Sequence, residues 1–399
     1  AAPTSAMGRI DDAIRRSQDW FWARQSAQGY WHAPLEANVS MDAEYVFFNR
    51  FMGRRPPQEK GVVDHIVATQ LGDGSWPLYH GGPGHLSDTI EGYFALKLAG
   101  FSPDDAPLAK AREFIRAHGG LEKAGVFTRT FLSYFGQFPD WALPAMPVEV
   151  ILLPPWFPIN IYALSSWARG TVVPLTILMA KSPRIAIEAG MGVEELWLER
   201  PTPERLGYPR SREWITWRNF FLAVDRTLKL LGRSPWKPLR QRAMRRAEDW
   251  IVSHQDWNGG WGGIQPAMIN SVMALRALGY ADDHPAVAKG LQGIDDFVAE
   301  HEGQVFYQPC VSPTWDTALA LKAMLDCGAD PTRPGMVKAA EWLIANQIFK
   351  KGDWSIYNPD LEPGGWAFEF ANDWYPDVDD SAVILMALIL SFLATLYPA

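Results

Sequence analysis

Three carboxylates lie within four residues, at Asp377, Asp379 and Asp380, directly before an apolar stretch that begins at Ser381. Burial and like-charged neighbours both raise a carboxyl pKa, so one member could stay protonated near neutral pH and act as an acid facing a hydrophobic space. The same residues could instead begin a helix, because Asp is a favoured N-cap and acids in the first turn complement the helix dipole. The motif alone leaves both interpretations open.

The composition limits the classes of function. A length of 399 residues allows about two or three domains with sizeable cores. The formal net charge of -8 provides no polybasic surface, so no nucleic acid partner is expected. Cys310 and Cys327 lack a CxxC spacing and a clustered histidine, which predicts no disulfide framework and no metal site and favours an intracellular setting. No cofactor is implied.

Aromatic residues are abundant, with 19 Trp, 20 Phe and 12 Tyr. They could fill a core, stack on carbohydrate or stabilise a cation over a ring face. No signal peptide is recognisable at the start of the sequence. The uncharged run from Ser381 to Ala399 is long enough to span a membrane, but we interpret it as a helix buried on all sides within a larger helical fold.

A repeat is formed by a glutamine, a short gap and Gly-x-Trp. Its four copies run from Gln25 to Trp31, from Gln70 to Trp76, from Gln255 to Trp261, and from Gln347 through Gly352 to Trp354. The glutamines are separated by close to one, four and two copies of a unit of about 46 residues, which is typical of a helical-hairpin repeat. Amphipathic segments precede the motif.

A second recurring element follows several copies, namely an N-cap-like Asp-Thr or Asp-Ser pair before an apolar helix, at Asp88, Asp316 and Asp380. Outer amphipathic and inner apolar helices joined by such turns predict an all-α fold of α/α-barrel type, and no long alternating strand pattern competes. This comparison gives Asp380 a generic capping role. It leaves Asp377 and Asp379 as the acids without a structural explanation.

The repeated glutamine-tryptophan (QW) motif together with Asp377-Val378-Asp379-Asp380 resembles the squalene–hopene cyclases, which are bacterial class II triterpene cyclases. The resemblance covers essentially the whole chain and includes the segments 38–45, 79–83, 160–169, 261–266, 312–317 and 363–368. The DCTAE-like acid motif of oxidosqualene cyclases is absent. The resemblance therefore implies an unactivated polyene substrate rather than an epoxide.

The resemblance implies two α/α barrels around a hydrophobic cavity. Residues 1–36 would pack with the later barrel, 37–311 would form the inserted barrel, and 312–399 would be part of the catalytic barrel. Family members are considerably longer, so we expect an incomplete second barrel, an exposed apolar helix at its end, and little activity without the missing C-terminal portion. That portion would hold a histidine supporting Asp379.

The resemblance also implies roles for individual residues. Asp379 would protonate a terminal alkene, supported by Asp377 and Asp380. The remaining cavity residues would be the cation-stabilising aromatics and the groups toward the far and product ends, namely Trp167, Trp315, Phe368, Ile264, Gln265, Pro266, Glu44 and Glu91. Asn270 stands where the family more often has an aromatic residue, so the cavity could differ there.

The implied chemistry is physically reasonable. An isolated alkene is a poor base, so its protonation needs a strong acid shielded from water. Aromatic faces stabilise the resulting cation, and a pre-folded substrate makes each ring closure an oriented intramolecular step.

A squalene-like substrate resides in lipid, so we expect a monotopic enzyme at the cytoplasmic face of a bacterial inner membrane. The segment 214–222, followed by Arg226, Lys229, Arg233, Trp236, Lys237 and Arg240, combines aromatic residues with cations, as interfacial elements do, although an ordinary surface helix would also fit. A homodimer is possible.

Three alternatives remain. An α/α-barrel glycoside hydrolase would need two carboxylates flanking a polar cleft, whereas these acids precede an apolar helix. A non-catalytic helical-repeat scaffold would leave Asp377 and Asp379 unexplained. A cyclase for another polyprenoid, of diterpene or sesquarterpene type, would share every feature above.

Overall fold

The computed structural model describes residues 6–207, 210–213, 215–232 and 237–396. The chain divides into two compact units. Unit 1 comprises Ala1–Leu35, Asp256–Ile264 and Cys310–Ala399, and unit 2 comprises Glu36–Gln255 and Gln265–Pro309. The third Gly-Trp turn, residues 256–264, therefore belongs to unit 1 by its internal contacts. The boundaries expected from the sequence had included it in the barrel of residues 37–311.

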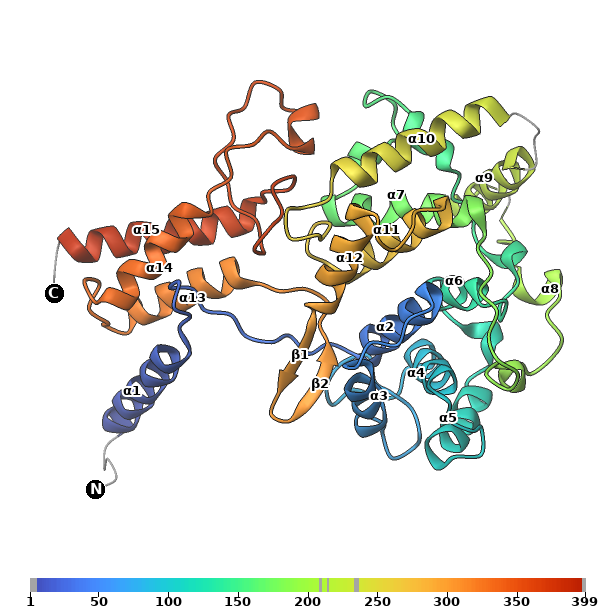
Figure 1. Cartoon of the computed structure of the whole chain (residues 1–399), viewed down its shortest axis with the longest axis horizontal. Coiled ribbons are helices and arrows are strands. Elements are labelled where there is room, and N and C mark those ends of the chain that lie inside the picture. The colour runs from blue at the N-terminus through green and yellow to red at the C-terminus, as the bar shows by residue number, and fades with distance from the viewer. Residues whose placement is uncertain (1–5, 208–209, 214, 233–236, 397–399) are drawn as a thin grey trace. The chain divides into compact units, whose positions relative to one another are not determined.

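In its described residues, unit 1 contains the α-helices α1 (Ala6–Arg24), α13 (Pro313–Asp326), α14 (Pro334–Ala345) and α15 (Val378–Leu396) and the short 3-10 helix η6 (Asp353–Ile356). Helix α13 lies side by side with α15 and also packs against α14 (Figure 1). Their shared core contains Trp31, Leu321, Met336, Trp366 and Ile384.

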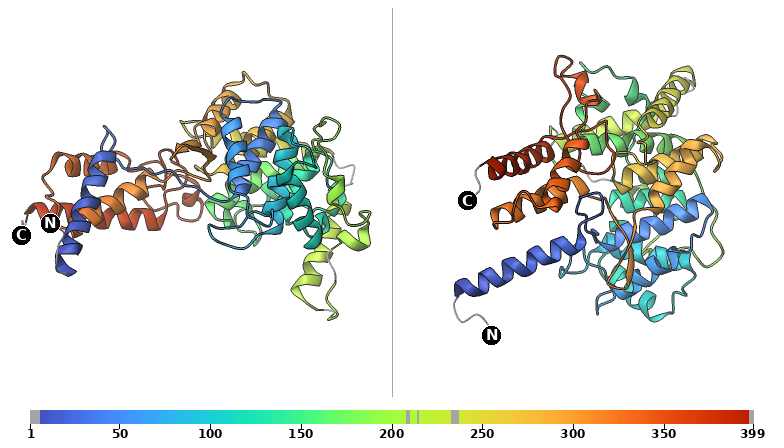
Figure 2. Two further views of the ribbon diagram at one scale, coloured as in Figure 1. Left: turned by 90° about the horizontal axis from the view of Figure 1, so that it is seen from below. Right: turned by 60° about the vertical axis from the view of Figure 1, so that its left-hand side comes forward.

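Unit 2 holds the other helices and the two strands. Its α-helices are α2 (Val39–Met52), α3 (Glu59–Ala68), α4 (Leu86–Ala99), α5 (Ala106–Ala117), α6 (Val126–Tyr134), α7 (Ser166–Lys181), α8 (Pro203–Leu206), α9 (Trp217–Gly232), α10 (Lys237–Ser253), α11 (Gln265–Leu278) and α12 (Pro285–Asp295). Its 3-10 helices are η1 (Leu121–Lys123), η2 (Asp140–Ala142), η3 (Val148–Leu152), η4 (Ile161–Ala163) and η5 (Glu194–Leu196). Helix α2 packs against α3 and α4, and α7 packs against α10 and α11 (Figures 1 and 2).

One hairpin interrupts the helical fold, formed by β1 (Val298–His301) and β2 (Gln304–Tyr307), which pair antiparallel with Val298 opposite Tyr307. The backbone N–H of Tyr307 donates to Asp42 Oδ1 at 2.8 Å, and the other oxygen of Asp42 lies 2.7 Å from His65 Nδ1. A buried carboxylate thus attaches the hairpin to α2 and α3. This hairpin was not expected from the sequence, because each strand is only four residues long.

The expected inner and outer helices are present. Helix α4 is buried at every position from Asp88 to Leu98, as an inner helix surrounded by protein must be. Helix α5 buries only Leu108, Ala111 and Ile115, which lie on one face at helical spacing. The fold is all-α and of α/α-barrel type.

The first and second glutamine-tryptophan turns each join three helices through side-chain hydrogen bonds. In the second copy, Gln70 Nε2 donates to the carbonyls of Gly74 and Pro107, both at 2.8 Å. Trp76 Nε1 donates to the Ile66 carbonyl of the preceding helix at 2.7 Å, and its backbone N–H donates to Thr89 Oγ1 of the following helix. Gly74 is required here because its φ is +86° and a Cβ would lie 2.4 Å from Lys110 Cβ.

The fourth turn corrects the sequence interpretation. Gln347 Nε2 donates to the Gly364 carbonyl at 2.6 Å, and Trp366 Nε1 donates to the Leu343 carbonyl at 2.6 Å. These are the bonds that Gln70 and Trp76 make in the second turn. The motif tryptophan is therefore Trp366 rather than Trp354. Residues 348–363 replace the short segment 71–73 of the second turn and contain an insertion, which separates Gln347 from its true partner.

The helix starts also differ from expectation. His85 and Ser312 occupy the N-cap positions of α4 and α13, so Asp88 and Asp316 lie inside the first turn rather than at the cap. Likewise α15 begins at Val378, and Asp377 Oδ1 accepts the backbone N–H of Asp380 at 2.9 Å in the manner of an N-cap. Asp377, which the repeat comparison left unexplained, therefore has a capping role.

Helix α15 is not buried on all sides in this chain. Leu385, Met386, Ile389 and Phe392 are exposed along one apolar face, whereas Ile384 and Ala387 are buried. The interpretation of a fully enclosed helix was therefore wrong, and the expected exposed apolar helix is observed. Within the described ranges, no helix combines the length and apolarity needed to cross a membrane.

Candidate active site

The three acids at the start of α15 differ in their surroundings. Asp380 is buried, with 2% of its surface exposed, whereas Asp377 is half-buried and Asp379 is exposed. The side chain of Asp377 lies between the other two and is hydrogen-bonded to both. The motif thus forms one connected carboxyl group cluster rather than three separate acids.

These surroundings separate the pKa values of the acids. Burial, followed by the hydrogen bond and charge of Asp377 and the charge of Asp379, raises the pKa of Asp380 to about 8. Burial also raises the pKa of Asp377. The hydrogen bond from Asp377 lowers the pKa of Asp379. Near neutral pH the cluster therefore holds a proton on Asp380, whereas exposed Asp379, the expected acid, is ionised in this structure.

The fourth glutamine-tryptophan turn positions this cluster. The backbone N–H of Asp377 donates to the Trp366 carbonyl at 2.9 Å, and the backbone N–H of Trp366 donates to Ser381 Oγ at 2.9 Å. Trp366 is itself buried among α13, α14 and α15. Asp377 and Ser381, on either side of the other two acids, are thus both hydrogen-bonded to the turn. Phe368, two residues after Trp366, is half-buried.

Unit 1 contains a second acidic group that sequence analysis missed. Glu369 is buried, and neither of its carboxylate oxygens has a hydrogen-bond partner among the described residues. Its carboxyl group occupies the space that a side chain at Gly263 would need, since a Cβ there would lie 1.6 Å from Glu369 Cδ. Burial, followed by the charge of Asp256, raises the pKa of Glu369 well above its ordinary value. Burial also raises the pKa of Asp256 to about 7.

The signal for Glu369 was present in the sequence as a single acid within Trp366-Ala367-Phe368-Glu369-Phe370. A glutamate in an aromatic run can be exposed, buried in an ion pair, or buried and neutral. Only the contact with Gly263, over one hundred residues earlier in the chain, shows that the Glu369 side chain points into the protein.

In unit 2, three of the expected residues come together. Gln265 Nε2 donates to Glu44 Oε2 at 2.6 Å, and Thr128 Oγ1 donates to Glu91 Oε1 at 2.5 Å. Burial raises the pKa of Glu44 to about 7. Burial, followed by the charge of Glu44, raises the pKa of Glu91 well above its ordinary value. At least one of these two glutamates is therefore protonated near neutral pH, because burial and the repulsion between like charges disfavour two ionised carboxylates.

Comparison with known proteins identifies the family. The family model described as the squalene-hopene cyclase N-terminal domain matches residues 14–303, and the model of the C-terminal domain matches residues 311–393. This chain belongs to the squalene–hopene cyclase family. The family expected from the repeated turns and the acid motif is thereby confirmed.

Its relatives include squalene–hopene cyclases and a dammaradiene synthase. A squalene–hopene cyclase of Alicyclobacillus acidocaldarius is 40% identical over 94% of this chain and 59% of the relative. One of Zymomonas mobilis is 38% identical over 95% of this chain and 58% of the relative. A dammaradiene synthase of Dryopteris crassirhizoma is 38% identical over 95% of this chain and 55% of the relative. The chain thus spans about three-fifths of the length of such relatives.

In this squalene–hopene cyclase family chain, the residues expected around the cavity are distributed over both units. Unit 1 carries the acid cluster together with Ile264, Trp315 and Phe368, all three half-buried. Unit 2 carries Glu44, Glu91 and Gln265 together with Trp167, Pro266 and Asn270. Trp167 is exposed on α7, whereas Asn270 is buried in α11.

Proposed function

We propose that this chain supplies the proton-donating part of a class II triterpene cyclase that converts a linear polyprenoid such as squalene into a polycyclic, hopene-type triterpene. The observation that carries the proposal is the carboxyl cluster at the start of the apolar helix α15, where the pKa of Asp380 is raised to about 8. An acid that is still protonated at neutral pH beside an apolar surface suits the protonation of an alkene.

In the proposed mechanism, Asp379 delivers the proton to a terminal alkene carbon and the π electrons form the new C–H bond, leaving a carbocation. Asp380 and Asp377 support this step, because the hydrogen bonds between Asp377 and both neighbours connect the protonated carboxyl to Asp379. Removal of water from Asp379 by substrate would raise its pKa and complete the transfer. Ring closures then follow as oriented intramolecular steps.

The aromatic residues Trp167, Trp315 and Phe368 are proposed to stabilise the successive cations by their ring faces. Ile264, Gln265 and Pro266 are proposed to lie at the far end of the substrate cavity, and Glu44 and Glu91 to accept the final proton or position water there. The support for the last assignment is the hydrogen bond between Gln265 and Glu44, together with the raised pKa values of both glutamates.

The test of the acid assignment uses a version of the enzyme as long as its relatives, assayed with squalene. We expect Asp379→Asn and Asp380→Asn each to lower turnover by about 10²- to 10⁴-fold, as for the loss of a general acid. The matched control is Asp373→Asn, which changes a nearby acid outside the cluster. Undiminished conversion by Asp379→Asn would remove Asp379 from the proposed role.

The pH dependence of the same enzyme provides a second test. If Asp380 supplies the proton to the cluster, activity is fully present below its pKa of about 8 and is lost as the pH rises through that value. Turnover that stays constant from pH 6 to about pH 10 would show that Asp380 does not hold the catalytic proton.

The product skeleton is a separate question. The dammaradiene synthase among the relatives favours, as a second candidate, a cyclase with another product or polyprenoid substrate. Mass spectrometry of products formed from squalene and from shorter and longer polyprenoids would distinguish these possibilities.

Membrane contact is part of the proposal, at the cytoplasmic face of a bacterial inner membrane. On α9, Trp217, Phe220 and Phe221 are exposed by 77%, 54% and 59% of their surface. Exposed aromatic residues on an amphipathic helix support a monotopic, interfacial position. Of the residues expected in this element, Trp214, Arg233 and Trp236 lie outside the described residues.

A further inference from the structure

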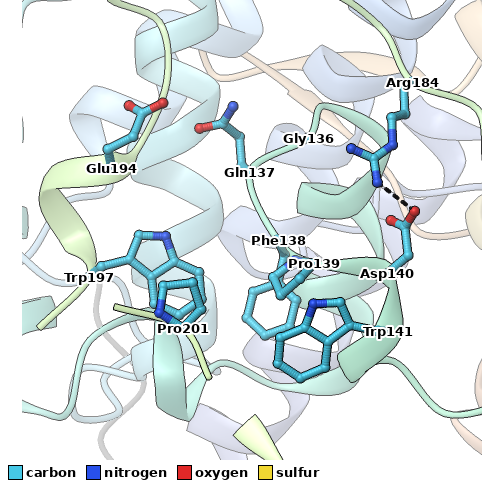
Figure 3. A pocket seen from close by; sticks show the side chains of 10 residues that line it. All are labelled: Gly136, Gln137, Phe138, Pro139, Asp140, Trp141, Arg184, Glu194, Trp197 and Pro201. Atoms are coloured by element: carbon cyan, nitrogen blue, oxygen red, sulfur yellow. Dashed lines mark hydrogen bonds and ion pairs between the residues drawn. The ribbon is translucent and has the colours of Figure 1, made fainter. Parts of the chain in front are cut away.

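Two features of this chain are not used by the proposed mechanism. The first is a pocket of about 530 Å³ in unit 2, between the segments 136–141 and 194–201, where Arg184 pairs with Asp140 at 2.7 Å (Figure 3). The second is Glu369 of unit 1, which is buried and has no hydrogen bond to either carboxyl oxygen among the described residues. The charges in the pocket offset each other, whereas a buried polar group without a hydrogen bond is costly and needs an explanation.

The side chain of Glu369 fills the space directly over Gly263. The φ of Gly263 is +58°, and a Cβ there would lie 1.6 Å from Glu369 Cδ and 1.9 Å from each carboxyl oxygen. Only glycine therefore leaves room for this carboxyl group. Gly263 directly precedes Ile264, which forms an antiparallel bridge with Cys310. The contact with Glu369 thus lies against the backbone that carries Ile264, one of the proposed cavity residues.

The backbone of Glu369 contacts the segment that carries a second cavity residue. Thr314 Oγ1 donates to the Glu369 carbonyl at 3.2 Å, and Thr314 is buried in the first turn of α13. The next residue in the chain is Trp315, which is half-buried. Phe368, a third proposed cavity residue, directly precedes Glu369 and is half-buried as well.

Three segments that are distant in sequence therefore meet at Glu369, and each carries one proposed cavity residue, namely Ile264, Trp315 or Phe368. Cyclisation depends on the relative placement of such residues, because a cation is stabilised only where a ring face lies against it. A displacement of about 1 Å at a reacting centre can cost about 100-fold in rate. A residue that fixes all three segments at once would control the course of the ring closures.

We propose that Glu369 is a positioning residue for the cyclisation, which fixes these three segments relative to one another by filling the space over Gly263. The inference rests on the proposed function, because the cavity roles of the neighbouring residues belong to it. Glu369 acts through its size rather than its charge, since neither oxygen has a partner among the described residues. Burial raises the pKa of Glu369 well above its ordinary value, which keeps the group neutral.

The test measures the products that the enzyme as long as its relatives forms from squalene, separated by gas chromatography with mass spectrometry. Glu369→Ala empties the space over Gly263, so the segments loosen and more cations lose a proton before the last ring closes. We expect the ratio of partly to fully cyclised products to rise about fivefold or more. Glu369→Gln, which keeps the size without a charge, should retain the wild-type ratio, as should Glu362→Ala, which changes an exposed acid.

A reciprocal exchange tests the contact itself. Gly263→Ala introduces a Cβ where the carboxyl group lies, so it should displace Glu369 and raise the same product ratio. In the double variant Gly263→Ala with Glu369→Ala, the new Cβ enters the vacated space. Its product ratio should therefore lie closer to the wild-type value than that of either single variant. A general loss of stability would lower the amount of active enzyme but would not produce this pattern of ratios.

Three results would overturn the positioning role. They are an unchanged product ratio in Glu369→Ala, a Glu369→Gln variant that behaves like Glu369→Ala and so shows that the charge matters, and a double variant in which the effects of Gly263→Ala and Glu369→Ala simply multiply. Each of these leaves the proposed cyclase function standing. A wild-type enzyme that forms no polycyclic product would instead refute the proposed function, and the positioning role with it.

Discussion

At the scale of single residues, this chain buries carboxyl groups in apolar surroundings and thereby keeps them protonated. Glu369 is the extreme case, since neither oxygen of its buried carboxyl has a partner among the described residues. An ionised carboxylate in that position would be strongly unfavourable, so the group titrates above its ordinary pKa of 4.5. At a pH between the ordinary value of 4.5 and the raised value, Glu369 is therefore protonated in the folded state but ionised in the unfolded state.

This linkage predicts the effect of Glu369→Gln. Because the folded-state pKa is raised, the stabilisation by Glu369 is complete below about pH 4.5 and is lost as the pH rises through the folded-state value. Glutamine cannot ionise, so the fall in Tm between pH 5 and pH 8 should be smaller in the variant, by on the order of a few degrees. Some dependence should remain, since the pKa of Asp256 is also raised.

The control is Glu362→Gln, an exposed acid seven residues earlier, which should retain the wild-type pH dependence. Thermal melts of the three proteins at several pH values make the comparison. Parallel curves for Glu369→Gln and wild type would mean that Glu369 is ionised in the folded protein.

At the scale of elements, the glutamine-tryptophan turn fixes the ends of the helices. The fourth copy offers a matched pair of tryptophans, because Trp366 Nε1 donates to the Leu343 carbonyl whereas Trp354 Nε1 has no partner among the described residues. Replacing either with phenylalanine removes the same atoms.

We therefore expect Trp366→Phe to lower the free energy of unfolding by about 1–2 kcal/mol more than Trp354→Phe, through the lost hydrogen bond and looser packing. Denaturant titration measures both. Equal destabilisation would argue that Trp366 is not the tryptophan of this turn.

The amphipathic helix α9 leads to a further prediction. Changing Trp217, Phe220 and Phe221 together to serine should reduce association with lipid vesicles about tenfold or more, since the apolar area available for insertion is lost. Trp257→Ser is the control, because that residue is exposed but lies outside α9. Flotation with vesicles provides the measurement, and unchanged flotation of the triple variant would exclude α9 as the contact.

At the scale of the whole molecule, the exposed apolar face of α15 is the most informative feature. Leu385, Met386, Ile389 and Phe392 are exposed on a helix that begins with the acid cluster. Since relatives are longer than this chain, we propose that further helices of the same fold cover this face. Such a cover would also remove water from Asp379.

This proposal predicts different behaviour for residues 1–399 and for a version as long as the relatives. Residues 1–399 alone should self-associate through α15, should bind hydrophobic dyes and should show little turnover. Ile389→Glu with Phe392→Glu should reduce that self-association but should abolish the activity of the longer version, because charges would be buried there. Full turnover by residues 1–399 alone would refute the need for a cover.

By itself, the sequence determined the helical class, the recurring turns, the family and the position of the acid motif. These features are local. They consist of the spacing of glutamine, glycine and tryptophan and of a run of carboxylates before an apolar segment, and both can be recognised without knowledge of distant contacts. Even so, the local spacing selected Trp354, since an insertion within residues 348–363 separates Gln347 from Trp366.

Only the tertiary structure decided which carboxyl groups hold protons. Asp377, Asp379 and Asp380 are neighbours in sequence, yet one is half-buried and caps a helix, one is exposed, and one is buried with a raised pKa. Gly263 likewise makes room for Glu369 from a distant part of the chain. The physical reason is that a pKa depends on desolvation and on nearby charges, both of which are set by residues that are close in space rather than in sequence.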